Sequence, residues 1–200
     1  GTFLLRLARG FLILALFFPT VYAHGRHTGR LIFTATLFTV SLGTFVWELA
    51  TWSKQAEAWH SAANTCYFFV LAYILIRYVA AQDAVSRNVV SATLVVYVML
   101  AFAWTFLYDF VETLQPGSFT RATIPGGEPN QRVVFFYFSM ITITTVGFGD
   151  VVPVSPMARM LTTTEALVGQ LYLVGAVATV VGLRTTTLFE QRRARRQEKE

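Results

Sequence analysis

Long apolar runs separated by short polar segments dominate the pattern of this chain. Residues 88–108 contain no charged side chain, and a helix of this length crosses about 30 Å of hydrocarbon. A second apolar run covers residues 166–183 and belongs to an expected helix that extends back to residue 157, and shorter runs cover residues 31–47 and 61–76. The pattern predicts an all-α, multi-pass membrane protein in which these runs are transmembrane helices.

The segment between the two longest runs has a different pattern. Residues 115–132 contain three prolines and three glycines, which interrupt helices and favour loops. Residues 133–144 are mostly apolar, but a helix of this length is only about 18 Å long and cannot cross the membrane. The irregular backbone that follows is tolerated at membrane depth only where protein buries it or it lines an aqueous path. We therefore expect a re-entrant half-helix and an extended segment between the two spans.

Charge is scarce and unevenly distributed. The chain is 54% hydrophobic and 14% charged, whereas about 25% of the residues of a soluble domain are charged. Basic residues lie at the ends of the apolar runs and in residues 184–200, so the net charge of +5 indicates membrane topology and not a nucleic-acid partner. By the positive-inside rule this tail is cytoplasmic, and residues 50–63 and 115–132 are outside. The single cysteine, Cys66, excludes an internal disulfide.

The first apolar stretch, residues 11–23, has three interpretations. It crosses the membrane with its N-terminus outside, or it lies on the inner surface as an interfacial helix. It also has the features of a signal peptide that is cleaved after Ala23. Cleavage there would leave His24 outside, against the topology that the other charges predict, so we disfavour it. The charges do not decide between the other two.

The extended segment after the half-helix has a composition suited to ion coordination. It reads Thr145, Val146, Gly147, Phe148, Gly149 and Asp150. Stacked rings of backbone carbonyls can replace the hydration shell of potassium, but successive carbonyls point the same way only if right- and left-handed residues alternate. Gly147 and Gly149 occupy alternate positions and reach left-handed torsions without steric cost. The hydroxyl of Thr145 adds another oxygen below the carbonyls.

This string, placed after a half-helix and before a long span, resembles the selectivity filter of the potassium channel pore family. The resemblance covers residues 88–183 and implies an outer helix (88–114), a pore helix (133–144) and an inner helix (157–183). It also implies that four copies of the filter surround one axis. Potassium would be coordinated by the Thr145 hydroxyl and by the carbonyls of Thr145, Val146, Gly147 and Phe148, with Gly149 completing the filter.

The resemblance further implies residues that support the filter, and here the chain departs from the family in two ways. Phe148 replaces the more frequent tyrosine, whose hydroxyl can tie the filter to the pore helix. Ile141 stands where some members have an acid that pairs with the residue at Asp150. Thr144 precedes the filter, Asp150 would brace it from behind, and Tyr137 belongs to an aromatic group of the pore helix, residues 135–138, that lies near it.

Two residues of the inner helix are candidates for further roles. Gly169 lies at the position that the family uses as a gating hinge, although close packing through a small residue explains a helical glycine equally directly. Glu165 is an acid within the predicted membrane region. It would line the cavity and attract cations, lie behind the filter in place of the missing pore-helix acid, or be a hydrogen-bonded or snorkelling acid near the outer interface.

These features predict a potassium-selective channel subunit that conducts passively as a homotetramer in the cell membrane. We expect residues 1–86 to form N-terminal helices, residues 87–183 the pore domain and residues 184–200 a basic cytoplasmic tail. Partners are membrane lipid and three further copies of the chain, with no nucleic acid, no cofactor besides the permeant ion and no soluble ligand-binding domain. The chain shows no catalytic constellation and is not expected to be an enzyme.

Two other functions remain open from the sequence. One is a cation channel with weak selectivity, although disrupted filters usually lack the aromatic residue or the second glycine. The other is a non-conducting membrane scaffold that retains the pore fold. Voltage sensing is disfavoured, because a sensor needs several arginines at three-residue spacing and the third apolar run has only Arg77, at its inner end.

Overall fold

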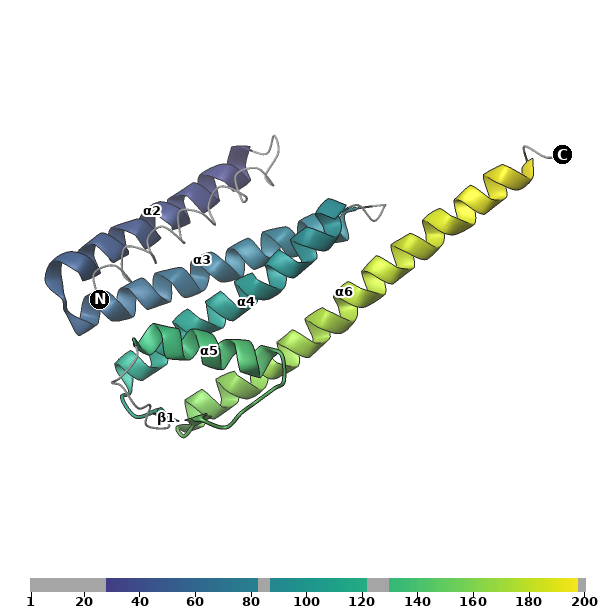
Figure 1. Cartoon of the computed structure of the whole chain (residues 1–200). Coiled ribbons are helices and arrows are strands. Elements are labelled where there is room, and N and C mark those ends of the chain that lie inside the picture. Colours follow the sequence, from purple (N-terminus) through teal and green to yellow (C-terminus); the bar gives the residue numbers. More distant parts are fainter. Residues whose placement is uncertain (1–27, 83–86, 122–129, 198–200) are drawn as a thin grey trace.

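The computed structural model of the chain describes residues 28–82, 87–121 and 130–197 (Figure 1). Within these described residues, four helices are long and apolar enough to cross a membrane. They are α2 (Thr28–Thr51), α3 (Lys54–Ala80), α4 (Arg87–Leu114) and α6 (Pro156–Gln197), and a shorter helix, α5 (Gln131–Ile143), lies between the last two. The predicted helical, multi-pass membrane fold is therefore confirmed. The stretch 11–23 lies outside the described residues.

The helices pack side by side in chain order. α2, α3 and α4 form a row, and α5 lies in the angle between α4 and the first part of α6 (Figure 1). Aromatic side chains hold α3 against α4, since the ring of Phe68 stacks on Phe102 and Phe106 at centroid distances of 5.4 and 5.6 Å. A second apolar cluster joins α4, α5 and α6 around Tyr108, which is fully buried.

The connection between α2 and α3 is much shorter than the sequence predicted. Residues 50–63 were expected to be an outer connection, but only Trp52 and Ser53 separate the two helices. Trp52 makes the turn with a left-handed φ of 54°, and the Ser53 hydroxyl caps α3 by accepting a hydrogen bond from the Ala56 N–H at 3.1 Å. Polar residues of the first turns of α3, including His60 and Ser61, are fully buried, so their polarity did not indicate a solvent-exposed loop.

Two short strands were not predicted. β1 (Phe119–Arg121) pairs antiparallel with β2 (Val151–Pro153), with Phe119 opposite Pro153 and Arg121 opposite Val151. This small sheet joins the segment that leaves α4 to the segment that follows the predicted filter. The chain turns into β1 at Gly117, which has a φ of 87° that glycine adopts readily. The sheet therefore fixes the far end of the loop that contains the filter.

The last helix differs from the predicted inner helix at its C-terminal end. α6 begins at Pro156, one residue before the expected start, but continues through residue 183 to Gln197 as one helix. It extends well beyond the other helices (Figure 1). The predicted boundary between pore domain and tail at residue 183 is therefore not a break in secondary structure.

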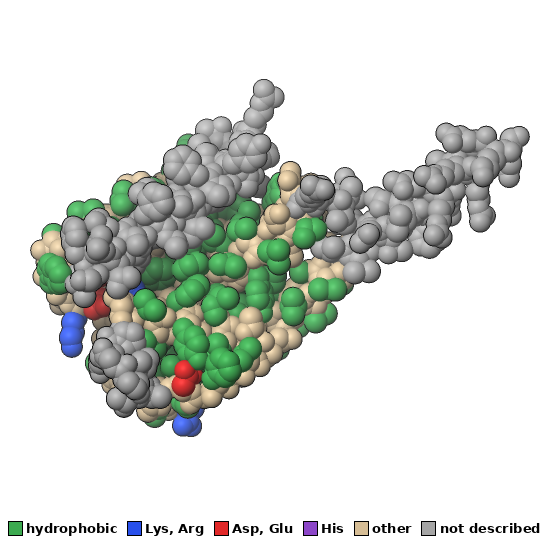
Figure 2. All heavy atoms as spheres, in the orientation of Figure 1, with side chains coloured by type: hydrophobic (Ala, Val, Ile, Leu, Met, Phe, Trp, Pro, Cys, Tyr) green, Lys and Arg blue, Asp and Glu red, His purple; other side chains and the backbone are tan. Residues whose placement is uncertain are grey.

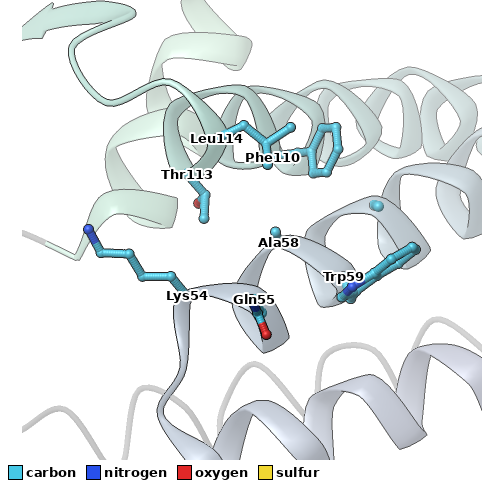
Figure 3. Close-up of a pocket in the computed structure, with 8 residues that line it drawn as sticks. Lys54, Gln55, Ala58, Trp59, Phe110, Thr113 and Leu114 are labelled. Carbon is cyan, nitrogen blue, oxygen red and sulfur yellow. The ribbon is translucent and has the colours of Figure 1, made fainter.

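The surface of the described residues is that of a membrane protein. Hydrophobic side chains cover much of the coloured part of the face seen in Figure 2, and the coloured charged side chains on it lie toward the end that holds the α2–α3 turn, α5 and β1. A hollow of about 420 Å³ opens between the start of α3 and the end of α4. Figure 3 shows Phe110 and Leu114 of α4 facing Ala58 and Trp59 of α3 across it. None of its lining residues belongs to the predicted filter.

Candidate functional site

The site is built on the short helix α5, which begins and ends with specific hydrogen bonds. The side chain of Asn130 caps the helix by accepting from the Arg132 N–H at 3.1 Å. Val134, Phe135, Phe138 and Ile141 face the protein interior and are buried. With thirteen residues the helix is about 20 Å long, too short to cross the membrane, and the predicted filter segment follows directly after it.

The backbone after α5 alternates in handedness. Positive φ angles occur at Thr145 (60°), Gly147 (53°) and Gly149 (78°), and the described residues between them, Val146 and Phe148, have none. The two glycines take the left-handed torsions predicted from the sequence. Thr145 was not expected to share them, because a β-branched residue in this region is a strained exception. Alternation turns successive carbonyls to the same side of the strand.

The filter segment itself completes the C-terminal end of α5. The last carbonyls of a helix lack helical partners and need others. The Ile141 carbonyl accepts from the N–H groups of Val146 and Gly147 at 2.8 and 3.1 Å, and the Thr142 carbonyl accepts from the Thr145 N–H at 2.9 Å. The Thr144 hydroxyl donates to the Met140 carbonyl at 2.6 Å. The start of the predicted filter segment is thus hydrogen-bonded to α5 in a fixed register.

Another hydroxyl occupies the remaining terminal carbonyl of α5. The Tyr97 hydroxyl of α4 donates to the Ile143 carbonyl at 2.6 Å, and its ring stacks on Tyr172 of α6 at 6.0 Å. The contacts of Ile141, which the sequence placed among the supporting residues, with the predicted filter segment are made by its backbone carbonyl.

Tyr137 holds the end of the predicted filter segment that is farther along the chain from α5. Its hydroxyl donates to the Asp150 carboxylate at 2.8 Å, and its ring lies nearly parallel to that of Phe148, at 6.5 Å and 9°. Asp150 also accepts from the Val151 N–H at 3.1 Å. Tyr137 thus supplies from the pore helix a hydroxyl link that Phe148 lacks. The predicted supports Tyr137 and Asp150 are brought together.

Glu165 lies behind the pore helix. It is fully buried, and it accepts hydrogen bonds from the hydroxyls of Tyr108 on α4 and Ser139 on α5. Ser139 also lies 2.9 Å from the Ala101 carbonyl. Of the three arrangements considered from the sequence, this position is closest to the one behind the filter. Its partner is the middle of the pore helix, and no hydrogen bond joins it to Asp150 among the described residues.

Gly169 lies against the last turn of the pore helix. A Cβ atom at this position would come within 2.5 Å of the Ile143 Cγ1 atom and within 2.9 Å of the Ile143 carbonyl oxygen. Contacts this short do not occur, so any larger side chain would displace α5 or α6. The close approach accounts for the glycine without a hinge.

Comparison with known proteins matches the part of the chain that holds this site. Residues 88–185, just under half of the chain, match the family model described as "Ion channel". These residues are similar to that family, and we call residues 88–185 the ion-channel domain. The match is to channels and not to enzymes. It includes α4, α5, the filter segment and most of α6, and leaves α2 and α3 outside.

Three relatives of the ion-channel domain are named as potassium channels. The inward rectifier potassium channel Kirbac3.1 of Paramagnetospirillum magnetotacticum is 36% identical over 87 residues, which are 44% of this chain and 25% of the relative. Two-pore potassium channel 4 of Arabidopsis thaliana is 41% identical over 56 residues (28% and 20%). The potassium voltage-gated channel protein shk-1 of Caenorhabditis elegans is 39% identical over 59 residues (28% and 11%).

These matches confirm the resemblance to potassium channel pores stated from the sequence. The aligned segments span a quarter or less of the length of each relative. No solved structure matches the chain at a significant level.

Sequence reasoning missed a buried ionic cluster at the edge of the ion-channel domain. Arg132, in the first turn of α5, forms ion pairs with Asp109 of α4 and with Glu48 of α2. The available signal was the presence of Glu48 and Asp109 at the ends of apolar runs, where acids are costly and tend to be functional. The described residues contain no group of three metal-ligating side chains placed to hold a metal ion.

Proposed function

We propose that the chain is a subunit of a potassium-selective channel that conducts passively through a homotetramer. Potassium is the transported substrate. The carbonyls of Thr145, Val146, Gly147 and Phe148 and the Thr145 hydroxyl coordinate it, and Gly149 completes the filter. The observation that carries this proposal is the alternation of handedness at Thr145, Gly147 and Gly149, because it turns successive carbonyls toward one side and offers dehydrated potassium a stack of neutral oxygen ligands.

The exposure of the filter supports assembly into a tetramer. One chain supplies one strand, and a carbonyl ring needs several strands around an axis. In the single chain the side chains of Val146 and Phe148 are 53% and 71% exposed, although such residues are usually buried. Leu167, Leu171 and Val174 of α6 are also exposed, at the spacing of one helix face. Neighbouring subunits and lipid would cover both surfaces.

The pore helix contributes electrostatically to the same site. The C-terminal end of a helix carries about −0.5 elementary charge, and α5 ends at the base of the filter. Four such ends around one axis favour a cation that has lost part of its hydration shell. The names of the three relatives support potassium as that cation. Because each relative is matched over a quarter or less of its length, potassium selectivity is a proposal for this chain.

The distribution of basic residues supports an orientation in the cell membrane. Residues 184–200 contain six Arg and Lys residues, and basic segments next to a span remain in the cytoplasm. With this end of α6 inside, the filter mouth, β1 and β2 face outward, and α5 enters from the outer side. Asp150 then lies at the outer end of the ion path.

Flux through purified protein tests the proposal. We expect proteoliposomes that contain only this chain to release potassium down its gradient when a protonophore balances charge, and native mass spectrometry to give four copies of the chain per particle. Protein that is tetrameric but passes no ion would indicate a scaffold. Flux of sodium equal to that of potassium would indicate a weakly selective channel, and a monomeric particle would contradict the shared filter.

A further inference from the structure

Arg132 lies at the centre of a buried ionic cluster that joins three helices. Its Nε atom is 2.6 Å from the Asp109 Oδ2 atom of α4. Its Nη1 and Nη2 atoms are 2.9 and 3.2 Å from the two carboxylate oxygens of Glu48, on α2. All three side chains are at most 9% exposed. The two-pronged contact with Glu48 is the strongest pairing geometry that arginine makes.

Polar neighbours complete the cluster from a further helix, α3. The Ser61 hydroxyl donates to Asp109 at 2.5 Å, and the Gln131 side chain of α5 donates to the same carboxylate at 2.9 Å. His60 lies 3.8 Å from Glu48. Glu57, which is 36% exposed, lies 3.6 Å from Arg132 at the edge of the cluster. Each of the helices α2, α3, α4 and α5 therefore contributes a side chain.

Such a cluster is costly to bury in a membrane protein. Taking ions out of water costs several kcal/mol per ion, which a well-formed pair offsets only in part. Apolar side chains would join helices at lower cost, so the cluster serves to specify a position more than to add stability. Buried ionisable groups at the ends of apolar helices are functional candidates for a similar reason.

The position that it specifies is that of the pore helix. α5 is held in its middle by Ser139 and Glu165 and at its end by the Tyr97 hydroxyl, and all of these partners lie within the ion-channel domain. The first turn of α5 is held through Arg132. One of the two acids that pair with Arg132, Glu48, lies on α2, outside that domain. Because a short helix moves as a rod, displacement of its first turn is transmitted to the Ile141 carbonyl and to the filter N–H groups bonded to it.

We propose that Arg132 is a positioning residue for the filter and that Glu48 makes α2 part of the filter's support. A shift of α2 relative to α4 then changes the fraction of time for which the filter conducts. Through the contact between Glu48 and Arg132, α2 acts on ion flow without a series of arginines that senses voltage. The inference rests on the proposed function, since it needs a conducting filter to be observed.

The test is a double-mutant cycle on conduction by single channels. Glu48→Gln and Arg132→Gln each break the pair, and we expect each to lower the open probability of assembled tetramers by about fivefold or more, the range of a coupling between sites. The double variant removes both charges of the pair and should lie closer to wild type than the product of the two single effects. Arg132→Lys keeps the charge but loses the two-pronged contact, so it should give an intermediate effect even if Arg132→Gln does not assemble.

Glu57→Gln is the matched control, because it removes an acid from the exposed edge of the same cluster and should leave open probability within about twofold, as weak exposed pairs do. Tetramers of Glu48→Gln that open as often as wild type would overturn the inference. So would single effects that multiply in the double variant, or a loss of assembly with unchanged opening of the tetramers that form. A wild type that passes sodium as readily as potassium would instead refute the proposed function itself, and this inference with it.

Discussion

The two ends of the pore helix are held by different kinds of interaction. At its C-terminal end the partners are backbone N–H groups of the filter and the neutral hydroxyl of Tyr97. At its N-terminal end the partners are the charged side chains of Glu48 and Asp109, which pair with Arg132. The first end depends on peptide geometry that few other sequences can adopt. The second depends on side-chain pairs, which can change without altering the fold, so under the proposed function the filter is fixed while its connection to α2 can vary.

The largest effect is expected at the backbone end. In Gly147→Ala, the new side chain meets no atom within 4 Å in the single chain, but the φ of 53° costs an alanine about 1–2 kcal/mol. Every subunit contributes this strain, so we expect the filter carbonyls to turn and selective potassium flux to be lost. Flux assays and the amount of tetramer after purification measure the two outcomes separately.

Gly175→Ala is the matched control for that substitution. Gly175 also has free space for a Cβ atom, but it lies within α6, where alanine is favoured over glycine by about 1 kcal/mol. This variant should conduct as wild type does and be slightly more stable. A Gly147→Ala channel that remains potassium-selective would show that left-handed backbone at this position does not set selectivity.

The next effect concerns the contact between the inner helix and the end of the pore helix. Gly169→Ala places a Cβ atom 2.5 Å from Ile143, and overpacking of this kind destabilises by about 1–3 kcal/mol. Thermal unfolding of the tetramer should therefore shift downward. A hinge role without close packing predicts the reverse, a more stable helix with altered opening, and that result would refute the packing explanation.

A smaller effect is expected behind the middle of the pore helix. Tyr108→Phe keeps the buried ring but removes one of the two hydroxyls that donate to Glu165. Loss of a buried hydrogen bond of this kind costs about 1–2 kcal/mol, measured as a lower unfolding temperature of the tetramer with potassium selectivity retained. Unchanged stability would mean that Glu165 is satisfied without Tyr108.

The smallest effect is expected at the outer mouth. Tyr137→Phe retains the stacking on Phe148 but loses the hydrogen bond to Asp150. This hydrogen bond is exposed in the single chain. We expect a cost of about 0.5–1 kcal/mol and a few-fold lower open probability in single-channel records, with selectivity unchanged. Restoring a hydroxyl by Phe148→Tyr on this background should recover part of the loss. An open probability identical to that of wild type would show that the stacking of the ring at position 137 on Phe148 stabilises the outer mouth without the hydrogen bond.

The same comparison explains which features were predictable from the sequence. The left-handed torsions of the predicted filter segment could be predicted because adjacent residues indicate them, with Gly147 and Gly149 at alternate positions. The spans were found because length and hydrophobicity decide them. The strain at Thr145 was not predicted, because its side chain gives no sign of it.

The ionic cluster was hidden for a different reason. Glu48 and Arg132 are separated by 84 positions in the sequence, and nothing local indicates that a long-range fold brings them together. The polar residues His60 and Ser61 were read as part of an outer connection, although burial against this cluster places them in a helix. The location of Glu165 behind the pore helix likewise depends on the crossing of α4, α5 and α6, which spacing along one helix does not determine.

The most direct test of the account is the reversal potential of the purified wild-type protein in a planar bilayer with potassium on one side and sodium on the other. An ion path made of backbone carbonyls in alternating handedness predicts a reversal potential displaced strongly toward that of a pure potassium conductor. A reversal potential near zero, with clear currents carried by both ions, would contradict the assignment of the filter to residues 145–149.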